Sequence, residues 1–414
     1  MLLAAFLAWM FAGLGIALFI LIHRQMMLDL LGRDAEEKVI ARWFAWFQAA
    51  FLFGAAAGGW IFGSLGDRIG RTRAMAISVV WQSAFTLCCY PATTPEALLC
   101  FRFLASMGIG GIWPNAVALV AEAWPDVSRP FLAGLLGAAA NVGQVLMGVL
   151  GLTFDVTPEA WRWTLVPASL PAIVGFWTLL VVPESVRWQR AKSQRVETNT
   201  NLRPIREVLT PPLLSRTLLG ICLGAIPVIG TAANGNWLVP WTDQANQQRV
   251  VDGEIVAKPD PKSKARTQIV RSAGGILGSL LGGIVAAVIG RRLSYFLISL
   301  GAMATSTYIF TQLDPLHPTF PYWVFALGFV GIVYFGWLPL FLPELFPTHV
   351  RSTGSGISFN TGRIVSGLVV LSAGVLLELV GGSYARVGFA TGLIYGVGMI
   401  IIWFAPRKSK GLED

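Results

Sequence analysis

The chain has 414 residues, of which 55% are hydrophobic and only 13% are charged, and its formal net charge is +9. Soluble globular domains carry about 25% charged residues, so this composition excludes an ordinary soluble protein. Many uncharged stretches are roughly 20 residues long, the length at which an α-helix crosses a hydrocarbon core of about 30 Å. The sequence therefore predicts an all-α integral membrane protein embedded in a lipid bilayer.

Hydropathy, together with the positions of Gly, Pro and charged residues, predicts about twelve membrane-spanning helices. The expected spans are 2–23, 42–64, 74–92, 96–122, 130–152, 161–182, 213–241, 267–289, 293–312, 320–342, 352–377 and 386–405. The first stretch has no basic start and no cleavage site of small residues. We therefore interpret it as the first span and not as a removable signal.

The positions of Lys and Arg predict the orientation of these spans. The excess lies at 68–73, 129, 183–216, 291–292, 351 and 407–410, whereas in 24–42 four basic residues meet four acidic ones. We therefore expect a multi-pass protein of the cell (inner or plasma) membrane, with both termini and residues 183–212 in the cytoplasm and residues 243–265 outside. The same distribution explains the net positive charge without a nucleic-acid partner.

Two charged motifs occur twice, which predicts that the chain consists of two related halves. GSLGDRIGRTR at 63–73 aligns with GIVAAVIGRR at 283–292 at a shift of 220. EAWPDVSR at 122–129 aligns with ELFPTHVR at 344–351 at a shift of 222. Nearly equal shifts indicate two six-span halves in the same orientation, namely 1–182 and 213–414, joined by a cytoplasmic linker at 183–212.

Parallel six-helix halves are the arrangement of major facilitator transporters, and several motifs resemble that superfamily. GSLGDRIGRTR resembles its signature between spans two and three, and RFLASMGIGG at 102–111 resembles its fourth-span signature. PESVRW at 183–188 and PELFPTHVRSTG at 343–354 are similar to the sugar and metabolite branches. RFLASMGIGGIWPNAVALVAEAWP together with SFNTGRIVSG resembles the proton symporters of lactate, sialate or aromatic acids. The resemblance implies a major facilitator fold of two parallel six-helix bundles, and transport by alternating access.

The charged turn at 63–73 is expected to form a cytoplasmic latch. Asp67 lies just inside the end of a membrane helix, where a charge is costly, and the resemblance implies that it contacts the start of span eleven and neighbouring arginines. The second copy has Ala287 and Val288 in place of Asp67 and Arg68. The alternative interpretation is a tight turn whose arginines only set the orientation. The gating residues that we expect are Gly63, Asp67, Arg68, Gly70, Arg71, Arg102, Glu122, Arg129, Glu344 and Arg351.

A carrier needs polar groups at mid-membrane depth that face the cavity between its halves. Asn360 and Arg363 are three residues apart and share a helix face. Arg363 lies about 18 Å along the helix from Arg351, near the middle of the membrane, and Asn141 aligns with it at the shift of 222. The substrate-binding residues that we expect are Arg363, Asn360, Asn141, Gln144, Asn234, Asn236, Arg271, Tyr334, Trp337, Trp113 and Asn115.

These arginines, with few acids at cavity depth, favour a small organic anion such as a monocarboxylate or a sugar acid, because guanidinium binds carboxylate through paired hydrogen bonds. One alternative is a facilitator of a neutral sugar or polyol in which Arg102, Arg271 and Arg363 are structural. Another is a transporter-like sensor. No Ser–His–Asp set, metal cluster or phosphate loop is visible in the sequence, so we expect neither an enzyme nor a metal or cofactor. Cys88, Cys89, Cys100 and Cys222 are interpreted as packing residues.

Span one departs from the pattern of the related symporters. They carry acids in a stretch resembling W-x-F-D-G-F-D, whereas this chain reads WMFAGLG, with Ala12 and Gly15 at the acidic places. We therefore expect uniport or exchange with little dependence on a proton gradient. His23 and Arg24 are expected to close the outer end of this span, and we expect the carrier to be a monomer.

Overall fold

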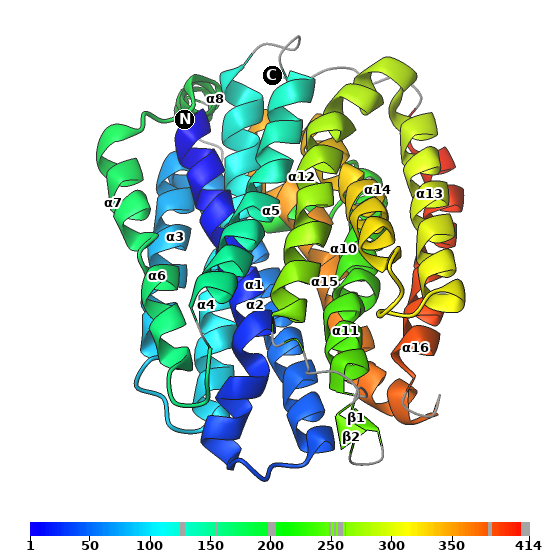
Figure 1. The fold of residues 1–414 in the computed structure, drawn as a ribbon. Coiled ribbons are helices and arrows are strands. Elements are labelled where there is room, and N and C mark those ends of the chain that lie inside the picture. Colours follow the sequence, from blue (N-terminus) through cyan, green and yellow to red (C-terminus); the bar gives the residue numbers. More distant parts are fainter. Residues whose placement is uncertain are drawn as a thin grey trace.

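The computed structural model describes residues 1–124, 129–154, 156–197, 204–247, 250–251, 254–255, 260, 262–379 and 383–406, and the fold is helical (Figure 1). The first group of elements is α1 (Leu2–Leu31), α2 (Glu37–Ile69), α3 (Arg71–Cys88), α4 (Pro95–Ala123), α5 (Arg129–Thr153), η1 (Trp161–Thr164), α6 (Leu165–Ser169) and α7 (Ala172–Val181). Helices α8 (Val186–Glu197) and α9 (Pro204–Val208) follow.

The second group contains α10 (Leu214–Ile229), η2 (Gly230–Asn234), η3 (Gly235–Trp237), α11 (Leu238–Gln247), α12 (Ser263–Ile289), α13 (Arg291–Gln312), α14 (Phe320–Phe341), η4 (Leu342–Leu345), η5 (Thr348–Val350), α15 (Arg351–Leu379), α16 (Tyr384–Gly392), α17 (Ile394–Ile401) and η6 (Ile402–Phe404). A short antiparallel hairpin pairs β1 (Val250–Val251) with β2 (Glu254–Ile255). Residues 198–203 of the expected linker, and parts of 243–265, lie outside the described residues.

Ten of the described helical segments are long and apolar enough to cross a membrane. Helices α3 and α15, of 18 and 29 residues, occupy the places of the predicted third and eleventh spans. At 1.5 Å per residue even α3 is about 27 Å long. Large apolar side chains such as Leu180, Val288 and Phe404 cover the outside, where they are more than three-quarters exposed. The chain is therefore a polytopic membrane protein, and its helices accommodate the predicted spans.

The two groups of helices lie side by side in Figure 1, the first mainly on the left and the second mainly on the right. They meet where α2 packs on α15 and where α5 packs on α12 and α14. Glycine makes this approach close, since a Cβ atom on Gly137 of α5 would lie 2.1 Å from the carbonyl oxygen of Phe335 on α14. Small residues allow such backbone contact between membrane helices. The interface between the groups therefore positions polar side chains from both of them.

Helix α1 differs from its predicted course, and span seven is irregular. Helix α1 continues to Leu31, and only Gly32, at φ 100°, ends it. His23 therefore lies within the helix and does not close an outer end. Its side chain is buried, and its Nε2 lies 2.9 Å from the carbonyl oxygen of Ile40. In span seven, at GTAANGNW, α10 passes into a π-helical turn and then a 3₁₀ turn. Backbone irregularity of this kind is tolerated at membrane depth where it is enclosed by protein or lines a cavity.

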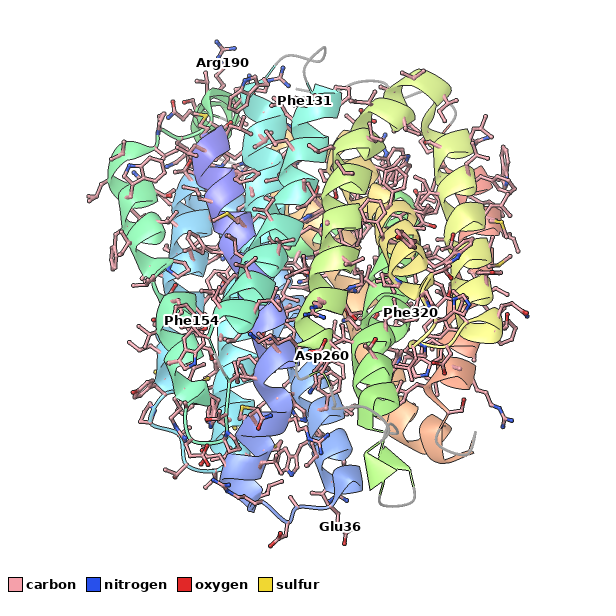
Figure 2. All side chains as sticks on the ribbon, in the orientation of Figure 1. Glu36, Phe131, Phe154, Arg190, Asp260 and Phe320 are labelled. Carbon is pink, nitrogen blue, oxygen red and sulfur yellow. The ribbon has the colours of Figure 1, made fainter. Side chains whose placement is uncertain are left out.

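Labelling of single cysteines tests the predicted orientation. Figure 2 shows Arg190, on α8, and Glu36 at opposite ends of the molecule, and Figure 1 places the N-terminus at the α8 end. Gln189 and Asp34 are both exposed, so only the side of the membrane should decide whether a cysteine there reacts. In intact cells with a cysteine-free background, Gln189→Cys is expected to resist a membrane-impermeant thiol reagent because it lies on the cytoplasmic side, and Asp34→Cys is expected to react because it lies outside. The opposite labelling pattern would reverse the topology.

Candidate functional site

Asp67 links the two groups of helices at the α8 end. Its carboxylate is fully buried and accepts the backbone N–H groups of Thr353, at 2.8 Å, and Ser352, at 3.4 Å, in the first turn of α15. The Thr353 hydroxyl also donates to it. The N–H groups of a helix N-terminus stabilise a carboxylate. Arg71 Nη1 lies 2.9 Å from the same carboxylate. We call the cluster of Asp67, Arg71, Glu122, Ser352 and Thr353 the latch.

Glu122 is the second anion of the latch. Its Oε1 accepts from Arg71 Nε and Nη2, at 3.2 and 3.1 Å, and from Arg351 Nη1, at 3.4 Å. The three side chains belong to α4, α3 and α15, and the side chains of both arginines are fully buried. Charges buried in this way are stable only when they are paired. The contact of Glu122 with Arg351 joins the two groups of helices a second time.

Residues at the start of the predicted linker contact the latch and the turn beside it. The Glu184 carboxylate accepts the backbone N–H groups of Arg71, at 3.0 Å, and Thr72, at 3.1 Å, so it caps the N-terminus of α3. A Cβ atom on Gly70, which has φ 114°, would lie 2.1 Å from Glu184 Oε2. The Trp188 indole donates to the carbonyl oxygen of Asp67 at 3.1 Å. PESVRW thus holds the turn, a role that sequence reasoning had not given to its residues.

The repeated motif has the same geometry in both groups. Arg71 Nη1 donates to the carbonyl oxygen of Gly66, and Arg291 Nη1 donates to that of Ala286, each at 2.9 Å. Arg291 Nη2 contacts Glu344 at 3.0 Å, as Arg71 Nη2 contacts Glu122. The second group lacks the acid, since Ala287 takes the place of Asp67. The duplication is therefore visible in the contacts, and Asp67 of the first copy contacts the start of α15, whereas the second copy has no acid at that place.

The other expected gating residues have different positions. Gly63 packs on α15, because a Cβ atom there would lie 3.3 Å from the carbonyl oxygen of Ser352, whereas Arg68 is exposed. The side chain of Arg129 lies outside the described residues. Arg102 does not belong to the latch, since it is 20 residues from Glu122 on α4, about 30 Å along the helix.

Arg102 lies instead against α1, beside the places where the related symporters have acids. Its Nη1 donates to the carbonyl oxygen of Gly15 at 3.1 Å, and its guanidinium lies over the rings of Phe19, at 4.2 Å, and Phe51, at 5.0 Å. Its Nε is buried without a hydrogen bond among the described residues. A backbone carbonyl and aromatic faces thus surround this cation where an acidic side chain would have been a proton acceptor.

Asp67→Asn tests the latch. The amide would oppose an N–H donor to the N–H groups of α15 and remove the charge that pairs with Arg71, so the latched state should become less stable. We expect the rate of transport to change severalfold while the equilibrium affinity for substrate stays close to that of the unmodified protein. Arg68→Gln, at the exposed neighbouring position, is the matched control. Unchanged rates at saturating and subsaturating substrate would contradict the assignment.

A cavity of about 110 Å³ lies between the two groups of helices. Five of the expected substrate-binding residues line it: Asn141, Gln144, Asn236, Arg271 and Arg363. They come from α5, η3, α12 and α15, so both groups contribute to its wall. The structure thus brings these five expected residues to one cavity.

Arg271 is held in the cavity wall by neutral amides. Its Nη1 donates to Asn236 Oδ1 at 2.8 Å, and its Nη2 donates to Gln268 Oε1 at 3.2 Å and to Gln144 Oε1 at 3.5 Å. Gln268 also donates to Gln144 at 2.8 Å, which ties α12 to α5 across the interface. Arg271 is only 8% exposed, and its Nε has no hydrogen bond in the described part of the chain.

Arg363 lies in the same cavity, on α15. Its Nη1 donates to Asn360 Oδ1 at 2.7 Å, and its guanidinium lies 4.9 Å from the Phe359 ring and 5.8 Å from the Phe51 ring. Asn360 is fully buried behind it, against Gly59 of α2. Asn360 therefore positions the guanidinium and does not itself line the cavity.

Five further expected residues lie away from the cavity wall. Asn115 belongs to the latch region, because it accepts from the Ser352 hydroxyl at 3.0 Å. Trp337 donates to Ser294 on α13, and Tyr334 contacts Ser299 on the same helix. Asn234 donates to the carbonyl oxygen of Gly388 and so fastens span seven to α16. Trp113 stacks behind Phe359 at 4.0 Å. Each therefore packs or fastens helices and does not face the cavity.

Aromatic side chains complete the wall, and sequence reasoning had missed them. Phe51, Phe335, Phe359, Tyr395 and Trp9 all line the cavity. The Phe335 and Phe359 rings meet edge to face at 6.0 Å. Phe359 had a signal in the sequence, because it lies one helical turn from Arg363 on α15. The cavity thus has two cationic side chains in an aromatic and amide wall.

Among the described residues, neither Arg271 nor Arg363 has a carboxylate within ion-pair distance. The described residues also hold no group of His, Cys, Asp or Glu that could bind a metal. The side chains of Asp155, Asp243 and Glu378 lie outside the described residues. The described wall of the cavity therefore carries two positive charges and neutral dipoles.

The sequence of the chain matches a family of known proteins. The family model of the sugar (and other) transporters matches residues 6–229. The chain is 28% identical over 346 residues, 81% of its length and 76% of the relative's, to a probable 4-methylmuconolactone transporter of Cupriavidus pinatubonensis. It is 25% identical over 364 residues to a cis,cis-muconate transport protein of Acinetobacter baylyi, covering 86% of this chain and 84% of the relative.

Solved structures agree on the fold. A proton:xylose symporter with bound 6-bromo-6-deoxy-D-glucose matches with a TM-score of 0.75 at 15% identity, covering 100% of this chain and 96% of that one. A human organic anion transporter matches with a TM-score of 0.73 at 13% identity, covering 97% and 98%. With the helices, the repeated latch motif and the cavity between the two groups, these matches lead to one conclusion. The chain belongs to the sugar (and other) transporter family, and it is a membrane transporter of the major facilitator type and not an enzyme.

Proposed function

We propose that the protein carries a small organic carboxylate across the membrane by alternating access, with Arg271 and Arg363 binding the carboxylate. The observation that carries this proposal is the presence of two buried guanidinium groups at one cavity, each held by amide oxygens. Guanidinium presents a planar fork of donors that matches a carboxylate. A bound carboxylate would supply the negative charge that the described wall does not.

The body of the substrate is proposed to be planar and unsaturated or aromatic. Phe51, Phe335, Phe359 and Tyr395 offer ring faces and edges on which such a body can pack. The named relatives support this class, since the transport proteins for cis,cis-muconate and for benzoate in Acinetobacter baylyi are each 25% identical to this chain. An aromatic wall beside a cationic end fits a molecule with one apolar face and one carboxylate.

A neutral sugar is the second candidate. Asn141, Gln144 and Asn236 present amide groups that can bind hydroxyls, and structures of a xylose transporter share the fold. In this case Arg271 and Arg363 would be structural cations. The two candidates differ in the charge of the ligand, which makes them easy to separate.

Ligand binding by the purified protein separates the candidates. We expect benzoate and cis,cis-muconate to raise the thermal unfolding temperature in a concentration-dependent way and D-xylose to leave it unchanged, because a ligand stabilises only the state that binds it. Uptake of radiolabelled benzoate into proteoliposomes that contain unlabelled benzoate then distinguishes a carrier from a sensor. Stabilisation by xylose alone would favour the sugar, and binding without uptake would favour a sensor.

A further inference from the structure

Both cavity arginines belong to the second group of helices, on α12 and α15. The amide side chains that the first group contributes to the described cavity wall, Asn141 and Gln144 on α5, are neutral, and the first group contributes no charged side chain to that wall. The oxygens that hold the guanidinium groups belong to the amides of Gln144, Asn236, Gln268 and Asn360. An amide orients a guanidinium but does not cancel its charge. The charge of the empty site is therefore uncompensated in the part of the chain that the structure describes.

This charge affects the two limbs of a transport cycle differently. Whenever the cavity closes between its inward-open and outward-open states, water must leave Arg271 and Arg363. Removing water from a charged group is costly unless an opposite charge replaces it. A bound carboxylate supplies that opposite charge during the loaded step, but nothing in the described cavity wall supplies it during the empty step. The empty carrier should therefore cross the occluded state more slowly than the loaded carrier.

We propose that the protein is an anion exchanger, in which the two uncompensated arginines block the return of the empty carrier, so that one organic anion crosses only in exchange for another. This inference rests on the proposed function, because it requires that the two arginines bind an anion. It also agrees with the loss of acids from span one, where Arg102 meets the carbonyl oxygen of Gly15 and no proton acceptor lies at Ala12 or Gly15. A titratable acid there could have been protonated during the loaded step and ionised during the empty step, when its carboxylate would have compensated a cation.

The first experiment compares net uptake with exchange for the unmodified protein. Proteoliposomes receive external radiolabelled benzoate, with unlabelled benzoate inside or with none, and potassium with valinomycin on both sides holds the membrane potential at zero. We expect the initial rate to be at least tenfold higher with internal benzoate, which corresponds to a difference of about 1.4 kcal/mol between the two barriers. Equal initial rates would overturn the exchange proposal.

The second experiment supplies the missing negative charge. Gln144→Glu keeps the shape of a side chain whose Oε1 lies 3.5 Å from Arg271 Nη2, and it would pair with that arginine in the empty site. We expect exchange to slow and net uptake to rise, so that the ratio of exchange to net uptake falls severalfold. Gln189→Glu, with the same change of charge at an exposed position on α8, should keep the ratio of the unmodified protein. If Gln144→Glu binds benzoate but keeps that ratio, the proposal fails.

Different results would contradict the proposed function and the exchange proposal. If the protein binds no carboxylate in the thermal-unfolding measurement, the proposed function fails and the exchange proposal fails with it. If benzoate binds and enters empty proteoliposomes as fast as loaded ones, the proposed function stands and only the exchange proposal fails. Should Gln144→Glu not fold, Asn141→Asp places a carboxylate on the same wall of the cavity, and the comparison on the unmodified protein decides independently of either variant.

Discussion

Replacing Arg363 with glutamine is expected to lower the affinity for a carboxylate substrate by about one to two decades, because a hydrogen bond to a charged group contributes roughly 1.5–3 kcal/mol. The side chain is 4% exposed, lines the cavity and is oriented by Asn360 at 2.7 Å. Isothermal titration of the purified protein with benzoate measures the change. Thermal unfolding without ligand shows whether the variant remains folded.

Two further variants separate binding of the anion from packing. Arg363→Lys keeps the charge but not the planar fork, so it should recover only part of the affinity. Asn360→Ala removes the group that orients the guanidinium and leaves the charge in place, so it should cause a smaller loss than Arg363→Gln. Normal benzoate binding by a folded Arg363→Gln protein would show that Arg363 does not bind the carboxylate. Failure of the ligand-free variant to fold would make the arginine structural.

The architecture could be predicted from the sequence because it depends on properties of single segments. A hydrocarbon core requires apolar helices of a given length, and the duplicated motifs at 63–73 and 283–292 indicated how many groups of helices to expect. The ends of helices were harder to place. Helix α1 passes the predicted boundary at His23, and the contact of that residue with Ile40, on the next helix, is not revealed by any pattern within α1.

Position along a helix predicted several residues that line the cavity, but not which neighbours the site residues face. Arg363, Arg271, Asn236, Asn141 and Gln144 line the cavity. Asn234, two residues from Asn236, instead faces α16, because the π-helical turn of span seven rotates the chain between them. The signature that contains Arg102 suggested gating, whereas its contact with Gly15 depends on the packing of α4 against α1. Contacts between helices are a property of tertiary packing and have no period in the sequence.

Glu122→Gln, in the latch, is expected to have the second large effect, a shift of the equilibrium between the closed and open states of the α8 end. Glu122→Gln would leave Arg71 and Arg351 without the carboxylate that they share, and both of these side chains are fully buried. Removing one partner of a buried ion pair costs roughly 3–5 kcal/mol. Arg351 reaches Glu122 only while α15 lies against α4, so much of this cost falls on the latched state alone. The equilibrium should therefore shift toward the state in which the α8 end is open.

Reactivity of a buried cysteine measures that shift. Ser355 is fully buried on α15, one turn beyond Ser352 of the latch. In the purified protein, the labelling rate of Ser355→Cys should rise at least about tenfold when Glu122→Gln is added, which requires less than half of the expected cost. Glu344→Gln is the matched control, because Glu344 forms the corresponding pair with Arg291 inside the second group of helices. That pair is kept whether the α8 end is open or closed, so its loss should lower thermal stability without changing the labelling rate. Equal labelling in the two variants would mean that the ion pairs stabilise the fold of each group and do not hold the α8 end closed.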